Sequence, residues 1–495
     1  MFDIDVMVVG GGINGAGIAR EAAGRCLSVV LVEKDDLAAH TSSASSKLIH
    51  GGLRYLEQLE LKLVRESLAE RQRLLRLAPH VVEPLQFVLP LSDAGPPAWM
   101  VRAGLFLYDH LGDRGRLPGT RPVRLHGPFS DGLRQAGGEA LTYWDCRVDD
   151  SRLVVLNAMS AAERSAEILT RTELLKARRE GGQWIVTYRT EGFRERTVGV
   201  RALVNAAGPW AADLFDRLSG YEERPRLRLV KGSHIVVPRL FTGDHAFILR
   251  GPDGRVVFAI PYERHFTLVG TTEVECGEPD APSISEDETD YLLAVVAPHF
   301  TAPVSRADIV WSWSGIRALC DDGSREPSRV TRDYKLKLDA PDGTAPLLSV
   351  LGGKITTYRS LAEKAVDLLD PFFATKRPRW SDDPLPGGDI HLLEVDSYVR
   401  SLTLRYPMMP LDLLDRLVRT YGTRTGGILK VAKRIEDLGE HFGAGLTARE
   451  VDYLIRHEWA RTGEDVLWRR TKRGLHLTKT QAARVDEYVR DEAWR

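Results

Sequence analysis

The first 33 residues contain the feature that most restricts how this chain can fold. A short apolar run, residues 6–9, leads into Gly10-Gly11-Gly12-Ile13-Asn14-Gly15, then a run of small residues (16–23) and a second apolar run (27–32) that ends at Glu33. In a βαβ unit, such glycines allow a tight turn, backbone approach to a pyrophosphate and close packing of the helix. The helix N-terminus then offers free N–H groups to phosphates. The pattern predicts a dinucleotide-binding fold.

Glu33 narrows the choice of dinucleotide. It follows Gly15 by 18 residues, where a carboxylate can accept hydrogen bonds from ribose hydroxyls. An acid here favours a free ribose, as in NAD or the ADP half of FAD, over a 2′-phosphate. A glycine turn without a ligand is the alternative, and the complete βαβ spacing argues against it.

A polar stretch, residues 41–55, follows this unit. It combines several hydroxyls with Lys47, His50, a Gly51-Gly52 pair and Arg54. Such residues make poor core material, but they suit a loop that binds a charged cofactor and substrate. We interpret the stretch as a binding site.

Two later apolar runs end in small or glycine-rich turns. Residues 202–206 lead into Ala207-Gly208, and residues 347–351 lead into Gly352-Gly353-Lys354. Backbone N–H groups beside glycines and an ammonium suit an anion or the edge of a flavin ring. An ordinary strand end and a helix cap are the respective alternatives.

Residues 225–345 contain alternating β-branched and aromatic residues with short turns, which predicts an antiparallel sheet that covers a substrate. Thr271, Arg317 and Arg332 are polar residues near the ends of the expected strands. Arginines at strand ends are usually solvated, so each alone is a weak indication of ligand contact. Beyond a linker, residues 375–389, the pattern turns helical, and the four cations of residues 469–473 are typical of a solvated face.

Length and charge exclude several classes of protein. A chain of 495 residues is expected to form two or three structural regions. Because 68 basic residues nearly balance 69 acidic ones, no global field favours nucleic acid. Four widely spaced cysteines argue against a zinc site or a disulfide framework, and for a reducing cytosol.

The N-terminus lacks the pattern of a signal peptide. The apolar segment 98–107 is too short to span a bilayer and carries Arg102. It predicts either a patch that rests on a membrane or an internal segment that covers the cofactor domain.

Motifs along the whole chain resemble those of the aerobic, FAD-dependent glycerol-3-phosphate dehydrogenases. They are residues 10–17, residues 41–47, His50-Gly51-Gly52-Leu53-Arg54-Tyr55-Leu56, Lys231-Gly232-Ser233-His234 and Gly352-Gly353-Lys354. The motifs are specific in combination.

The resemblance implies an α/β protein with an α+β cap. We expect a glutathione-reductase-like FAD-binding Rossmann domain, an antiparallel-sheet substrate cap and a helical C-terminal domain. The expected limits are 1–80, 141–220 and 346–374 for the FAD-binding domain, 81–140 and 221–345 for the cap, and 390–495 for the C-terminal domain.

The resemblance also implies oxidation of sn-glycerol 3-phosphate to dihydroxyacetone phosphate by hydride transfer to flavin N5, with electrons passed to a membrane quinone. The alternatives are a glycerol-3-phosphate oxidase that uses O2, an amine or amino-acid oxidase, and a non-catalytic dinucleotide sensor. We expect a cytoplasmic homodimer bound peripherally to the inner face of the cell membrane, without nucleic acid or a metal ion.

The expected chemistry assigns roles to individual residues. A base must take the C2 hydroxyl proton, and His50 is the first candidate because imidazole accepts protons near neutral pH. By resemblance, Arg317 and Lys354 are alternative catalytic groups, and Lys354 could stabilise a developing alkoxide. The residues predicted to bind substrate offer forked or hydroxyl donors: Arg54, Tyr55, Thr271 and Arg332, with Arg317 also able to bind the phosphate.

The residues predicted to bind FAD come from the four loops described above. They are Gly10, Gly12, Ile13, Asn14, Gly15, Glu33, Lys34, Thr41, Ser42, Ser43, Ser45, Ser46, Lys47, Leu48, Ala207, Gly208, Gly353, Lys354, Ile355 and Thr356.

Overall fold

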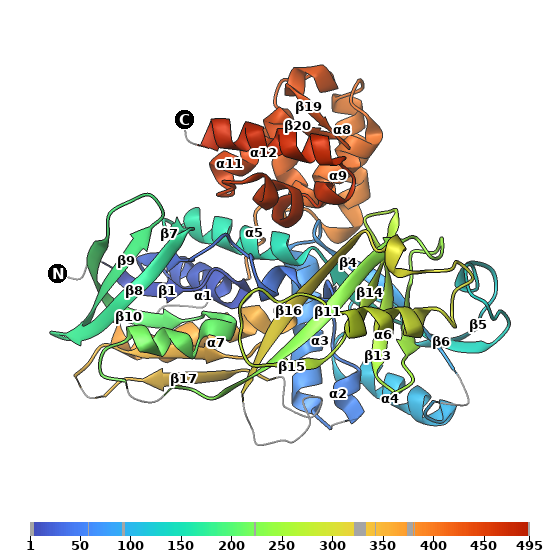
Figure 1. Cartoon of the computed structure of the whole chain (residues 1–495), viewed down its shortest axis with the longest axis horizontal. Coiled ribbons are helices and arrows are strands. Elements are labelled where there is room, and N and C mark those ends of the chain that lie inside the picture. Colours follow the sequence, from blue (N-terminus) through green and yellow to red (C-terminus); the bar gives the residue numbers. More distant parts are fainter. Residues whose placement is uncertain are drawn as a thin grey trace.

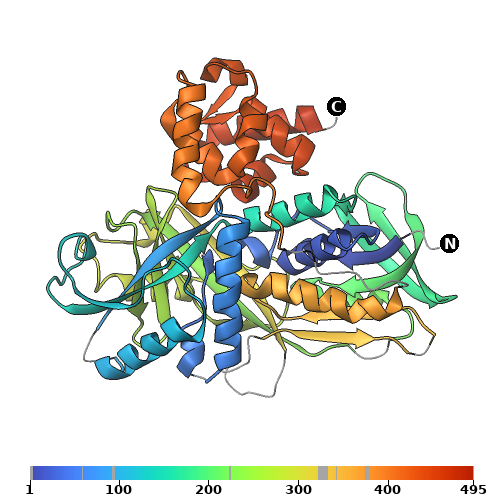
Figure 2. The ribbon, with the colours of Figure 1, turned by 180° about the vertical axis from the view of Figure 1, so that it is seen from behind.

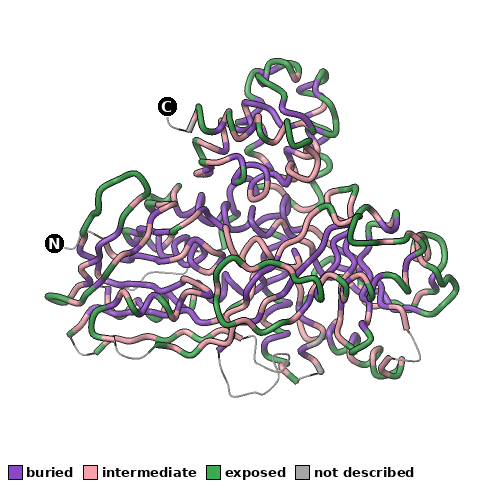
Figure 3. Tube along the Cα trace, viewed as in Figure 1, coloured by how far each residue is buried: buried purple, intermediate pink, exposed green. Residues whose placement is uncertain are grey.

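Two large sheets and a helical C-terminal domain form the molecule (Figure 1). The computed structural model describes residues 4–57, 59–91, 95–221, 224–320, 333–341, 343–373, 380 and 382–493, without the side chains of residues 54, 57 and 493. Within these ranges, buried residues are concentrated in the strands and in the helices that cover them (Figure 3).

The first sheet has eight strands among the described residues, in the order β17-β18-β10-β1-β2-β7, with β9 pairing both β10 and β8. Their bounds are β1 (Ile4–Val9), β2 (Val29–Val32), β7 (Glu167–Leu169), β8 (Thr172–Glu180), β9 (Gln183–Thr190), β10 (Arg196–Asn205), β17 (Lys335–Asp339) and β18 (Leu347–Leu351). Strands β18, β10, β1, β2 and β7 are parallel. Their carboxyl ends therefore meet at one edge, where α/β sheets bind ligands.

Alternation along β1 separates the two cores of this sheet. Val6 and Val8 face one buried cluster and Met7 and Val9 face another, as the period of two in a strand requires. The first cluster is covered by α1 (Ile13–Gly24), α5 (Asp150–Ala162) and α7 (Tyr358–Leu369), which lie side by side in Figure 2. The second is covered by the hairpin of β8 and β9.

The second sheet has ten strands among the described residues, in the order β15-β11-β14-β13-β12-β4-β6-β3, with β16 paired to β11 and β5 to β6. Its bounds are β3 (Leu48–Ile49), β4 (Val82–Pro90), β5 (Arg121–Arg124), β6 (Glu139–Val148), β11 (Leu227–Pro238), β12 (Ala246–Arg250), β13 (Val256–Tyr262), β14 (Phe266–Gly270), β15 (Val274–Cys276) and β16 (Trp311–Cys320). The pairs are antiparallel except for β12 with β4.

Four helices accompany this second sheet: α2 (Arg54–Glu57), α3 (Leu61–Leu77), α4 (Ala98–Leu111) and α6 (Glu286–Val296). Apolar residues of α3 and α4 form a buried cluster with β4 and β14, and those of α6 form a separate cluster with β12 and β13. The predicted fold class, α/β with an antiparallel cap and a helical C-terminal domain, is confirmed.

Three strands lie in a different sheet from the one that the expected limits give them. Strand β17, placed in the cap, pairs with β18 of the first sheet. Strands β3 and most of β6, placed with the FAD-binding domain, belong to the second sheet, because β6 pairs with β4 from Val82 to Pro90. Strand pairing depends on contacts between segments distant in sequence, which alternation within one segment does not encode.

The C-terminal domain contains α8 (Val395–Arg405), α9 (Leu411–Tyr421), α10 (Thr425–Leu429), α11 (Ala448–His457) and α12 (Lys479–Ala493), with a small hairpin of β19 (His441–Gly443) and β20 (Leu446–Thr447). It has its own apolar core. The prediction that residues 469–473 form a solvated face is wrong, since Arg470 and Lys472 are buried. They lie against acidic residues of the FAD-binding region.

Helix α4 has one buried and one exposed side. Its residues Leu105 and Tyr108 are buried in the cluster with the second sheet, whereas Trp99 and Phe106 are 69% and 65% exposed. One face therefore packs internally and the other is open. Among the described residues, none of the helices has both the length and the apolar character needed to cross a membrane.

Candidate functional site

The turn after β1 lies directly against the turn after β10. Gly10 has φ +114°, and a Cβ at this position would overlap the Ala206 carbonyl and lie 3.1 Å from Ala207 Cα. The backbone N–H of Ala206 donates to Val9 O at 2.9 Å. The predicted cofactor residues Gly10, Ala207 and Gly208 are thus brought together by the parallel pairing of β1 and β10.

The N-terminus of α1 meets two other predicted loops. Ser42 Oγ accepts the backbone N–H of Ile13 at 2.9 Å, and Asn14 Nδ2 donates to Gly352 O at 3.2 Å. A Cβ on Gly353 would lie 2.9 Å from Asn14 Nδ2. Two segments far from α1 in the sequence therefore contact its first turn.

Glu33 is oriented by backbone donors on both of its oxygens. Oε2 accepts the N–H of Gly11 at 2.6 Å and Oε1 accepts that of Asp35 at 2.8 Å. Burial raises the pKa of Glu33, while these two hydrogen bonds oppose the rise. The carboxylate is thus fixed beside the glycine turn, as ribose binding requires.

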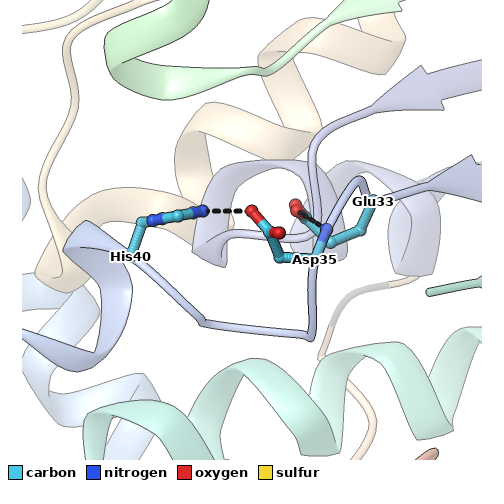
Figure 4. A group of neighbouring side chains, drawn as sticks. All are labelled: Glu33, Asp35 and His40. Carbon is cyan, nitrogen blue, oxygen red and sulfur yellow. Dashed lines mark hydrogen bonds and ion pairs between the residues drawn. The ribbon is translucent and has the colours of Figure 1, made fainter. Parts of the chain in front are cut away.

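His40 and Asp35 adjoin Glu33, and the sequence interpretation missed both. Figure 4 shows Asp35 between His40 and Glu33, with His40 Nε2 2.7 Å from Asp35 Oδ2. The hydrogen bond with His40 is the main cause that lowers the pKa of Asp35. Ligand atoms of the three residues lie within 4.8 Å of one another. Because backbone N–H groups already engage both Glu33 oxygens, we assign the cluster to the dinucleotide site.

These features fit FAD. Glycines hold the backbone close to α1, Glu33 stands beside them, and Asn14 Oδ1 is buried with no hydrogen-bond partner among the described residues. A buried acceptor without a donor is costly, and a bound ligand could supply one. The fit rests on Gly10, Gly12, Asn14 and Glu33.

Two predicted cofactor residues have other contacts. Lys47 Nζ donates to Asp150 Oδ1 and to Ser43 O, both at 2.8 Å, and burial lowers its pKa. Leu48 packs in the core of the second sheet. Lys47 therefore shapes the loop through its ammonium, and the Leu48 side chain stabilises β3.

Lys34, another predicted cofactor residue, contacts Asp35 and Trp210. Its Nζ pairs with Asp35 at 2.6 Å and lies 4.6 Å from the centroid of the Trp210 ring. Lys34, His40 and Trp210 line a cavity of about 1310 Å³ together with Trp311. Gly12, Asn14 and Glu33 are not among its lining residues.

Residues 41–47, which we call the cofactor loop, lie against β16, the strand that contains Arg317. Thr41 Oγ1 donates to Ile316 O at 2.7 Å, and Trp313 Nε1 donates to Ser45 O at 3.3 Å. A Cβ on Gly232 would lie 2.7 Å from Thr271 Oγ1 and 2.8 Å from Arg317 Nη2. The backbone of β11 thus leaves space for both predicted substrate donors on the same side.

His50, Tyr55 and Lys354 also converge. The His50 N–H donates to Thr356 Oγ1 at 3.3 Å, and Lys354 Nζ lies 3.6 Å from the centroid of the Tyr55 ring. A Cβ on Gly352 would lie 3.5 Å from the carbonyl of Ala318, which follows Arg317. The loop of residues 352–357 therefore joins His50 and Tyr55 to β16.

The backbone after His50 is held by a buried polar group that the sequence interpretation missed. Tyr108 Oη accepts the Gly51 N–H at 2.8 Å and donates to Asp145. Asp145 pairs with Arg71 at 2.6 Å. These residues come from three distant segments, and no local motif connects them.

His234 is a further site residue, indicated in the sequence only by the motif that contains it. Its Nε2 lies 2.9 Å from Ser46 Oγ, and its ring stacks on Trp313 at 5.4 Å between centroids. Burial first, and then Arg317 and Lys47, keep the pKa of His234 well below its usual value. The imidazole is therefore neutral near physiological pH.

Two predicted substrate residues are not placed. Arg332 lies outside the described residues, and only the backbone of Arg54, in α2, is described. Of the other predicted residues, Tyr55 lies in α2, Ile13, Asn14 and Gly15 lie in the first turn of α1, and Arg317 lies in β16.

Comparisons with known proteins agree with this architecture. A family model described as FAD dependent oxidoreductase matches residues 5–359, and a model of the C-terminal domain of alpha-glycerophosphate oxidase matches residues 381–492.

Two relatives match almost the whole chain. A glycerol-3-phosphate dehydrogenase of Pseudomonas aeruginosa is 53% identical over 99% of this chain and 95% of its own length. A D-erythritol 1-phosphate dehydrogenase of Brucella abortus is 49% identical over 98% and 97%. The crystal structure of glycerol-3-phosphate dehydrogenase from Bacillus halodurans complexed with FAD has a TM-score of 0.76 at 25% identity, covering 99% of this chain and 94% of that one.

Proposed function

Because this chain belongs to the FAD-dependent oxidoreductase family, we propose that it oxidises sn-glycerol 3-phosphate at C2 to dihydroxyacetone phosphate. The observation that carries the proposal is that Arg317 and Thr271 both adjoin Gly232, and Lys354 adjoins Tyr55, beside the loops that fit FAD. The name of the P. aeruginosa relative supports the substrate. Bound FAD would supply the hydride acceptor, N5 of its flavin ring.

The substrate phosphate would be bound by Arg317 and Thr271. A guanidinium offers paired donors to phosphate oxygens, and a neighbouring hydroxyl adds one more. Arg317 Nη1 lies 3.8 Å from Glu273 Oε1, and Arg317 Nη2 adjoins Gly232 beside Thr271. Tyr55 and Lys354 would lie at the polyol part of the substrate.

His50 is our candidate for the base, and Lys354 is the alternative. The His50 backbone is fixed from both sides, by Thr356 and through Gly51 by Tyr108. A backbone held in this way limits the positions of the imidazole, as proton transfer requires. The Lys354 ammonium would stabilise the alkoxide that develops when the proton leaves.

Replacing His50 with Asn should slow reduction of the bound flavin by glycerol 3-phosphate by about 100-fold, within the range for loss of a general base. Asn keeps a polar side chain of similar size but cannot accept the proton. The pH profile of the reduction rate should also shift, because Asn cannot take up the proton. Stopped-flow measurement of flavin absorbance checks both effects.

The matched control is His110→Asn, since His110 is exposed on α4. It should reduce flavin at the normal rate. A normal rate in His50→Asn would transfer the role of base to Lys354.

Anaerobic titration of the holoenzyme with glycerol 3-phosphate tests the proposed function directly. We expect stoichiometric bleaching of the flavin absorbance. Parallel titration with D-erythritol 1-phosphate, the substrate in the name of a 49% identical relative, tests the length of the polyol. If only D-erythritol 1-phosphate bleaches the flavin, that compound and not glycerol 3-phosphate is the substrate. Bleaching by an amino acid would indicate an amino-acid oxidase. No bleaching by any of these would revive the non-catalytic sensor.

We infer that α4 rests on a membrane and that the electron acceptor is a quinone dissolved there. Trp99, Met100, Phe106 and Leu107 are exposed on this helix, and such a face partitions into the bilayer interface. The helix also carries a basic group, Arg102. The cytoplasmic location and the homodimer remain predictions.

The paired change Trp99→Ser and Phe106→Ser should weaken binding to anionic phospholipid vesicles by at least 100-fold, because each aromatic side chain contributes about 1.5 kcal/mol or more on burial. Phe193→Ser, at another site that is 65% exposed, is the matched control and should bind normally. Vesicle co-sedimentation measures both. Equal binding by all three proteins would remove α4 from the proposal.

O2 is the alternative acceptor, and it is favoured by one observation: residues 381–492 match the C-terminal domain of alpha-glycerophosphate oxidase. Turnover in air distinguishes the two acceptors. Stoichiometric peroxide release would establish an oxidase, whereas reduction of added quinone with little peroxide would support the dehydrogenase.

A further inference from the structure

The C-terminal domain contacts the FAD-binding region mainly through buried charges. We propose that residues 469–472, which we call the basic clamp, position the cofactor loop, so that Arg470 and Lys472 are positioning residues for FAD although they lie in a different domain. The clamp reaches the loop from two sides, through Asp36 and through the start of α5.

Asp36 provides the first connection. Arg470 donates to both of its oxygens, at 2.6 and 2.8 Å, and Arg469 Nε donates to Oδ2 at 2.7 Å. The side chains of Asp36 and Arg470 are 1% and 0% exposed. A forked, buried pair of this kind fixes the carboxylate in both position and orientation.

The position of the Asp36 carboxylate affects Glu33, the residue predicted to bind the ribose. Asp36 follows Asp35, whose backbone N–H donates to Glu33 Oε1. Glu33 in turn accepts the Gly11 N–H within the glycine turn. A displacement of Asp36 would therefore be transmitted through Asp35 to the orientation of the Glu33 carboxylate.

The start of α5 provides the second connection. Lys472 Nζ donates to Asp149 Oδ1 at 2.8 Å and to Ser151 Oγ at 2.6 Å. Asp149 caps α5 by accepting the Arg152 N–H, and Arg152 forms a buried ion pair with Glu458 of the C-terminal domain. Thus the domain holds the N-terminus of α5 at several points.

Asp150, which lies between Asp149 and Ser151 in the sequence, binds the cofactor loop directly. Asp150 accepts hydrogen bonds from Lys47 Nζ at 2.8 Å and from Ser45 Oγ at 2.7 Å. Lys47 in turn donates to Ser43 O. The clamp therefore acts on Ser43, Ser45 and Lys47 through α5, and on Glu33 through Asp36.

The largely buried pair of Arg416 and Glu450 in the C-terminal domain does not have this geometry. Arg416 binds Glu450 at 2.6 and 2.7 Å, with Tyr421 also donating to Glu450, all within the domain. This pair is also charged and largely buried, and its hydrogen bonds connect residues within the domain. Its link to α5 is indirect, since Arg152 lies over the Tyr421 ring at 4.9 Å from the centroid. It provides a matched control for a purely structural effect.

The test measures FAD retention by the full-length holoenzyme, without substrate. Arg470→Met should raise the dissociation constant for FAD at least tenfold and alter the visible circular dichroism of the bound flavin. Arg470→Lys, which keeps the charge, should recover part of the affinity. Arg416→Met should lower the thermal stability but retain FAD as the unmodified protein does. FAD release after dilution, followed by flavin fluorescence, provides the dissociation constant.

The proposal would be overturned by normal FAD retention in Arg470→Met or by an equal loss in Arg416→Met. The pair Asp36→Asn with Arg470→Met also removes the buried carboxylate, which in Arg470→Met keeps only Arg469 of its two described guanidinium partners. Restored retention in this double variant would overturn the proposal, because the charge and not the connection would be responsible. If Arg470→Met does not fold, Lys472→Met takes its place with the same expected loss. Because no substrate is used, the outcome is independent of the proposed oxidation of glycerol 3-phosphate.

Discussion

Replacing Arg317 with Met should raise the KM for glycerol 3-phosphate by about 10- to 100-fold. A hydrogen bond to a charged group contributes about 1.5 to 3 kcal/mol, and Arg317 and Thr271 both adjoin Gly232 in the site. Arg317→Lys should have a smaller effect, since the charge remains but the fork of donors is lost. Steady-state kinetics with a dye acceptor measures KM and kcat separately.

Arg306→Met is the control for this change. Arg306 lies on the surface, where it pairs with Glu286 and Asp290, so its loss should leave KM unchanged. The flavin of Arg317→Met should remain bound, because no predicted cofactor contact depends on the guanidinium. Unaltered KM and kcat in Arg317→Met would remove this residue from the phosphate site.

Replacing Gly10 with Ala should abolish FAD binding under conditions in which the unmodified protein is saturated. The backbone φ of +114° is strained for any residue with a Cβ, and the methyl group would overlap the Ala206 carbonyl. Strain and overpacking each cost about 1 to 3 kcal/mol, so the turn must shift away from the end of β10. The flavin content of the purified, folded protein, measured by absorbance, checks this expectation.

Gly427→Ala provides the comparison, because a Cβ at Gly427 would have no atom within 4 Å. This variant should contain normal FAD, and its stability should rise by up to about 1 kcal/mol, because Ala is favoured over Gly within a helix such as α10. If Gly10→Ala binds FAD as well as Gly427→Ala does, the close approach of the β1 and β10 turns is not required by the cofactor.

The motifs of the chain indicate the family through their resemblance, and the comparisons confirm it. Residues alone did not identify the substrate, since relatives of nearly equal identity are named for different polyol phosphates. The choice between such substrates depends on the shape of the site around the polyol.

The sequence by itself determined the βαβ unit of residues 4–33. Its turn, its small-residue helix and its closing acid are contiguous, so each part is constrained by backbone sterics and packing over a few residues. Gly15, for example, must be small because a Cβ there would overlap the Gly10 carbonyl in the same unit. Local sequence expresses such requirements directly.

Only the tertiary structure decided which charged side chains are buried and which distant residues pair with them. Arg470 was expected in solvent, but it binds Asp36, 434 residues away, and both are buried. The Tyr108 and Asp145 pair behind Gly51 was equally invisible in the sequence. Whether a charged side chain is solvated or buried depends on the free energy of a partner supplied by another segment, and no periodicity within one segment specifies that partner.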